Sequence, residues 1–152
     1  MIACVLVALD NSTPTEDVFN AAAEIAERFG ARLHPLRVVS VPPEFPARGH
    51  RVDPLSAFQE NMAVEALRQL AGQNPGLVVE APIVRAGEPW RLILEVGDDL
   101  DADLIVIGSR GYKGSDRHLG RTAANVVNMA RRKVLVVQAR VSTLPITVRP
   151  AT

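Results

Sequence analysis

The sequence has a single cysteine, no surplus of either charge and few aromatic residues. Its 152 residues include 17 basic and 17 acidic side chains, and aromatics make up 4 %. A net charge of zero argues against a general nucleic-acid or membrane-surface protein, because such proteins carry an excess of Lys and Arg that meets phosphate groups. The length is that of one domain. Cys4 has no partner for an internal disulfide, and its apolar neighbours are typical of a buried strand.

No long apolar segment is present either. The longest apolar run, residues 2–9, has eight residues, whereas a membrane-spanning helix needs about 20. The N-terminus lacks the basic segment, apolar stretch and small-residue cleavage site of a secretory signal. Together with the single cysteine, these features predict a cytoplasmic protein with no membrane partner.

The common motifs for phosphate loops, metals and nucleophiles are also missing. The chain has no G-x-x-x-x-G-K-[ST] sequence, and the turn after the first predicted strand has no glycine, which excludes P-loop and dinucleotide sites. His34, His50 and His118 are isolated, with no Cys or His at ligand spacing, so no metal site is predicted. Ser115 and Asp116 lie close to His118 in one loop, but nothing arranges them as a catalytic triad. We therefore expect no catalytic residues.

The chain does contain alternating strand and helix patterns. Apolar runs predict strands at 2–9, 33–39, 77–84, 104–107 and 134–137. Apolar residues at helical spacing predict helices at 14–29, 55–70 and 89–100, and a fourth helix opens at Gly120. In the first helix the apolar stripe consists of Val18, Ala22, Ile25, Ala26 and Phe29. This order predicts an α/β domain over 1–138 with an open five-stranded parallel sheet and helices on both faces.

Two segments fall outside this alternation. Residues 40–54 contain four prolines and no periodicity, so they form either a lid over a ligand or a mobile loop. The C-terminal tail, 139–152, is either an additional edge strand or disordered.

Ligands of parallel sheets bind beyond the carboxyl ends of the strands, where the strand order reverses. Asp10 directly follows the first strand and is either a turn residue or a ligand acceptor. The stronger candidate comprises the glycine-rich segment 108–114 and the start of the last helix at 120–122. Glycines let a ligand approach the backbone, and the first N–H groups of a helix form an anion site.

Positive charge is concentrated in the same region. Residues 108–133 contain seven basic side chains and one acidic side chain, a local charge of +6. Three of the seven, at 131–133, are predicted to close the last helix, where cations offset the helix dipole. The other four favour a phosphate-binding site: Arg110, Lys113, Arg117 and Arg121.

Several motifs together resemble one known family. The segment Asp101-Ala-Asp-Leu-Ile-Val-Ile-Gly-Ser-Arg-Gly111, followed by Gly120 and Val134-Leu-Val-Val137, resembles the universal stress proteins. Further matches are Val5-Leu-Val-Ala-Leu-Asp10, Leu36-Arg-Val-Val39 and Ala86-Gly-Glu-Pro89. The resemblance covers residues 2–138. It implies a Rossmann-like fold of the adenine nucleotide alpha hydrolase type, a role in stress response and a homodimer formed through the last strand, Val134 to Val137.

One branch of this family binds ATP through the pattern G-x2-G-x9-G-[ST]. The resemblance implies that this chain binds ATP or another adenine nucleotide, with Mg²⁺ accompanying it. Asp10 and the backbone at Val38 would hold adenine and ribose, and Gly108, Gly111 and the Gly120 turn would hold ribose and phosphates. The full set of implied nucleotide-binding residues is Ala8, Leu9, Asp10, Val38, Gly108, Arg110, Gly111, Gly120, Arg121 and Thr122.

The chain departs from the family pattern after the second glycine. Eight residues separate Gly111 from Gly120, and Arg121 stands where the pattern has Ser or Thr, with Thr122 one place later. Arg121 adds a donor fork suited to phosphate but replaces a hydroxyl that would contact phosphate or ribose. Thr122 compensates if the helix begins one residue later.

The resemblance, with this departure, implies two alternative functions. The first is a stress-response regulator that binds an adenine nucleotide and is not primarily an enzyme, since no general base is positioned. The alternative is a dimeric interaction module of the same family that binds no nucleotide. Such a module would engage an unknown protein partner through its dimer surface and its tail.

Overall fold

The structure, a computed structural model, describes residues 1–9, 15–39, 76–109 and 119–138, together with Glu65, Arg68, Gln69 and Gly72. The predicted loop 40–54 and tail 139–152 lie outside the described residues, as does most of the predicted helix 55–70. The elements are β1 (Cys4–Leu9), α1 (Thr15–Phe29), β2 (Arg32–Val39), β3 (Ile83–Ala86), α3 (Pro89–Asp99), β4 (Leu104–Gly108), α4 (Arg121–Met129) and β5 (Lys133–Val137).

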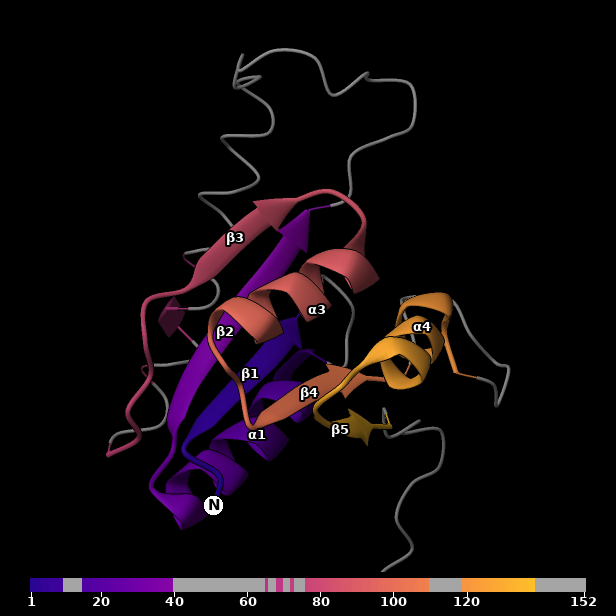
Figure 1. Cartoon of the computed structure of the whole chain (residues 1–152). Coiled ribbons are helices and arrows are strands. Elements are labelled where there is room, and N and C mark those ends of the chain that lie inside the picture. The colour runs from indigo at the N-terminus through magenta and orange to yellow at the C-terminus, as the bar shows by residue number, and fades with distance from the viewer. Residues whose placement is uncertain are drawn as a thin grey trace, which may run out of the picture.

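The strands form one parallel sheet in the order β3-β2-β1-β4-β5 (Figure 1). α1 covers one face of the sheet, and α3 and α4 cover the other. The predicted five-stranded parallel sheet with helices on both faces is confirmed. Among the described residues, no helix has both the length and the apolar character needed to cross a membrane.

The side chains of β1 alternate between two apolar cores. Val5 and Val7 pack with Phe19 on the face covered by α1. Leu6 packs on the opposite face with Val126 of α4. All five side chains are fully buried. A central strand covered on both faces has no solvent-facing side, which explains why its sequence is continuously apolar instead of alternating.

The predicted strand 77–84 was wrong in its bounds. The regular pairing covers only Ile83–Ala86, and Val79 forms an isolated bridge with Leu33. The N–H and C=O of Leu33 both bond to the chain around Val79, at 3.0 and 2.8 Å. Alternation along β2 turns the nitrogen of Pro35 to the same side, and proline has no N–H to donate. The ladder is therefore interrupted beside Pro35 and resumes at β3.

Candidate functional site

The order of the strands reverses between β1 and β4. In their parallel register Val7 lies opposite Val106. Continuing this register by two residues brings Leu9 and Gly108, the last residues of the two strands, to the same edge of the sheet. This edge is where doubly wound sheets bind their ligands.

Backbone hydrogen bonds of Ser109 attach the start of α4 to this edge. The N–H of Ser109 donates to the carbonyl of Val137 in β5 (2.9 Å), and the carbonyl of Ser109 accepts the N–H of Gly120 (2.7 Å). Ser109 is only 6 % exposed. The glycine that ends β4 and the glycine that precedes α4 are thereby brought together, although eleven residues separate them along the chain.

Gly120 is the N-cap residue of α4. It is extended, with φ −60° and ψ 161°, and its carbonyl accepts the first helical bond from Ala124 at 2.9 Å. The N–H groups of the first helical turn have no acceptor within the helix, and they lie at the positive end of its dipole. α4 begins at Arg121 itself and not one residue later, so Thr122 does not take the position that follows the cap. This helix end has the polarity that phosphate groups require.

The structure also places the predicted residues on the strands. Ala8 and Val38 are half-buried and pack toward the α3 and α4 side, near the ends of β1 and β2. The side chain of Leu9 belongs to the core under α1, so Leu9 has only its backbone to offer a ligand. At the start of α4, Arg121 is exposed and Thr122 is half-buried. Three predicted site residues lie outside the described residues: Asp10, Arg110 and Gly111.

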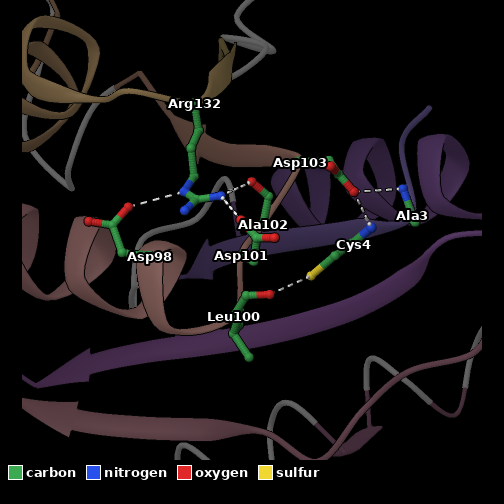
Figure 2. Close-up of polar contacts among 8 residues, drawn as sticks. All are labelled: Ala3, Cys4, Asp98, Leu100, Asp101, Ala102, Asp103 and Arg132. Carbon is green, nitrogen blue, oxygen red and sulfur yellow. Dashed lines mark hydrogen bonds and ion pairs between the residues drawn. The ribbon is translucent and has the colours of Figure 1, made fainter.

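The prediction that residues 131–133 close the last helix was wrong. α4 ends at Met129 and has no basic residue in its last turn. The guanidinium of Arg132 instead reaches the end of α3, where it meets Asp98, Asp101 and the carbonyl of Ala102 (Figure 2). Hydrogen bonds to Asp101 and Asp98 raise the pKa of Arg132 above its ordinary value. These contacts lie at the amino edge of the sheet, opposite the candidate site.

Asp103, in the segment with the most specific motif, has a structural role. Its carboxylate accepts the N–H groups of Ala3 (2.8 Å) and Cys4 (3.0 Å) at the start of β1 (Figure 2). These two bonds hold the pKa of Asp103 below its ordinary value. Burial, and then the Asp103 carboxylate, raise the pKa of the Cys4 thiol. Cys4 therefore stays protonated at neutral pH, and a protonated thiol is a poor nucleophile. This is consistent with the packing role predicted for Cys4.

Comparison with known proteins identifies the family. The sequence profile described as the universal stress protein family matches residues 1–138. The chain belongs to the universal stress protein family. A relative from Coxiella burnetii, universal stress protein A homolog 1, is 29 % identical over 137 residues, which cover 88 % of this chain and 94 % of the relative.

Solved structures of universal stress proteins share the fold. UspA from Lactobacillus plantarum is 25 % identical with a TM-score of 0.72, and the match covers 90 % of this chain and 97 % of that one. The universal stress protein from Archaeoglobus fulgidus in complex with dAMP is 28 % identical with a TM-score of 0.64, covering 90 % and 98 %. The family and the fold predicted from the motifs are both confirmed.

Two features of this universal stress protein were not predicted from its sequence. Ser109 lies inside the glycine-rich motif, but nothing local shows that its two backbone groups join β5 to α4. The only sequence signal for this role was that a small polar residue follows a buried strand within the glycine-rich motif. The partners of Arg132 carry no local signal, because Asp98 is 34 residues away along the chain.

Proposed function

We propose that this universal stress protein is a regulator in stress response that binds an adenine nucleotide, with ATP the preferred form. The carrying observation is the hydrogen bond between Ser109 and Gly120, which holds the start of α4 at the end of β4. The site then combines a glycine backbone, unpaired helix N–H groups and the Arg121 cation, a set suited to phosphates. The dAMP complex of the Archaeoglobus relative supports adenine as the base.

In this proposal different parts of the edge hold different parts of the nucleotide. The backbone at Ala8, Leu9 and Val38 faces adenine and ribose, and the start of α4 faces the phosphates. Asp10, Arg110 and Gly111 lie outside the described residues, and we include them in the proposed site because of the sequence motif alone. Arg121 places a positive charge where the family pattern has a neutral hydroxyl, so we expect the affinity to rise with the number of phosphates.

We propose binding and not catalysis as the main activity. The groups gathered at the described part of the site are backbone amides, a hydroxyl and a guanidinium, which bind phosphates but are poor proton acceptors at neutral pH. Among the described residues no three or more His, Cys, Asp or Glu are grouped as metal ligands. A Mg²⁺ ion accompanying ATP would therefore be held mainly by the phosphates, as Mg²⁺ commonly is.

Calorimetry with ATP, AMP and cyclic AMP tests this function. We expect one ATP per chain, bound more tightly than AMP because the additional phosphates extend the contact with α4. Mass spectrometry of the small molecules released on denaturing freshly purified protein should find an adenine nucleotide. If concentrated protein gives no heat with any of the three nucleotides, the interaction-module alternative is favoured instead.

We also propose that two copies pair through β5. Among the described strands β5 lies at one edge of the sheet, and Val134 to Val137 are only half-buried. Such an apolar edge is a template for pairing with another strand. The carbonyl of Val137 bonds to Ser109 on the β4 side, so alternation turns the N–H of Val136 to the outer edge.

Substituting this outward N–H tests the pairing. Val136→Pro removes a donor on the outer edge and leaves the ladder with β4 intact. Sedimentation velocity should give a dimer for the wild type and a monomer for Val136→Pro. A monomeric wild type at high concentration would exclude pairing through β5.

A further inference from the structure

Arg132 connects the chain after α4 to the turn between α3 and β4. Its Nε lies 3.1 Å from Asp98 Oδ1, and its Nη1 lies 3.0 Å from Asp101 Oδ1 and 2.8 Å from the carbonyl oxygen of Ala102. The side chain is 21 % exposed, whereas Arg28, in the i,i+4 pair with Glu24, is 76 % exposed. Exposed ion pairs of that kind contribute little to the stability of a fold. A guanidinium that is mostly shielded and bound to three oxygens is a defined contact, which we name the Arg132 clamp.

The turn that receives Arg132 is built around an unusual residue. Asp101 has a φ of +51°, the only positive φ of a non-glycine among the described residues. The turn closes α3 through hydrogen bonds from Asp101 to the carbonyl of Asp98 (3.1 Å) and from Ala102 to the carbonyl of Gly97 (2.9 Å). Glycine is the usual residue at this position of such a turn, because it adopts a positive φ without strain. Asp is less favourable there, but it supplies a carboxylate, and that carboxylate contacts Arg132.

The clamp and Ser109 hold opposite ends of α4. At the N-terminal end, Gly120 bonds to Ser109 beyond β4. At the C-terminal end, Ala130 bonds to the carbonyl of Val126, and two residues later the chain is fixed to α3 by Arg132. Between these anchors Val126 packs in the core that α3 also lines. The nine residues of α4 form a rigid rod of about 13 Å, so displacing one end moves the other.

We infer that Arg132 is a positioning residue for phosphate recognition: the Arg132 clamp sets the orientation of α4 and thereby the aim of its first N–H groups. This inference rests on the proposed function, because it assigns a role to the same phosphate-binding end of α4. In this inference Arg132 lies at the amino edge of the sheet, opposite the candidate site, and does not contact the nucleotide. It acts through the helix.

The main test compares Arg132→Gln with Arg131→Gln. Both variants lose one positive charge, but Arg131 is exposed and lies beyond the end of α4, so it controls for long-range attraction of the nucleotide. We expect Arg132→Gln to raise the Kd for ATP by about threefold to tenfold relative to Arg131→Gln, which lies within the usual range for coupling through packed elements. The Kd for adenosine should change much less, because adenosine has no phosphates. Circular dichroism at the titration temperature should show that both variants are folded.

Further variants separate positioning from simple loss of stability. Arg132→Lys keeps the charge but cannot reproduce a planar fork on three oxygens, so its Kd should lie between those of the wild type and Arg132→Gln. Asp101→Asn removes the charged acceptor and tolerates the positive φ. It should weaken ATP binding alone but add nothing in the Arg132→Gln background.

Amide hydrogen exchange of the nucleotide-free protein gives an independent result. Arg132→Gln should speed exchange in α4 but not in α1. If the folded Arg132→Gln variant binds ATP as tightly as Arg131→Gln, the positioning role is wrong. If the wild type binds no nucleotide, the proposed function fails, and phosphate positioning fails with it; the exchange data then still report whether the clamp holds α4.

Discussion

Replacing Arg121 by Glu is expected to weaken ATP binding by about tenfold or more. Arg121 is the first residue of α4, and its exposed side chain lies at the helix end that faces the phosphates in the proposed complex. Reversing its charge replaces attraction by repulsion, and one charge pair at 4 Å near a protein surface is worth about 4 kcal/mol. Even a partly screened reversal therefore exceeds the 1.4 kcal/mol or so that corresponds to tenfold in Kd.

The same substitution should leave the protein folded. A carboxylate in the first turn of a helix interacts favourably with the helix dipole, so Arg121→Glu is expected to keep or slightly raise the melting temperature. Calorimetry should therefore show weaker ATP binding, whereas thermal unfolding should show no loss of stability. A loss of binding accompanied by a large loss of stability would indicate misfolding and not electrostatic repulsion.

Two further variants complete this experiment. Arg131→Glu makes the same change of charge beyond the other end of α4 and should weaken ATP binding by less than about threefold, because salt screens charges more than a Debye length away. Arg121→Ser introduces the hydroxyl of the family pattern. Weaker binding by Arg121→Ser would show that the guanidinium contacts phosphate, and tighter binding would show that the hydroxyl is the better ligand. If Arg121→Glu binds ATP like the wild type, α4 does not face the phosphates.

Phe19→Ala should lower the free energy of unfolding by about 3–5 kcal/mol, the usual cost of deleting a buried aromatic side chain. Phe19 is fully buried in the core between α1 and the sheet, where it packs with Val5 and Val7. The expected loss is large beside the 5–15 kcal/mol or so that stabilises a typical domain. Urea unfolding followed by circular dichroism measures it, with the m-value showing whether unfolding remains two-state.

Phe29→Ala is the matched control on the same helix. The helical spacing predicts Phe29 on the buried stripe with Val18, but that prediction was wrong, since Phe29 is the last residue of α1 and is 55 % exposed. We expect its removal to change the unfolding free energy by no more than about 1 kcal/mol. Equal losses in the two variants would mean that α1 does not pack on the sheet through the face that holds Phe19.

The sequence by itself determined the parallel sheet and the region of the candidate site. β1 and β4 are continuously apolar because both their faces are covered, and strands of that kind alternating with amphipathic helices leave few topologies open. The glycines at 108 and 120 and the nearby cations marked the edge where a ligand would bind. These signals are local: each depends on residues within one turn, one strand or one loop.

Only the tertiary structure decided which distant groups meet. Pro35 interrupts the pairing of β2 because of the side to which its nitrogen turns, and that side depends on the register with the neighbouring strand. The attachment of Gly120 to Ser109 and of Arg132 to Asp98 and Asp101 depends on how α4 packs against α3 and the sheet. Charge at 131–133 was visible in the sequence, but its partners were not, because a helix-end cation and a cation bound to another helix have the same local pattern.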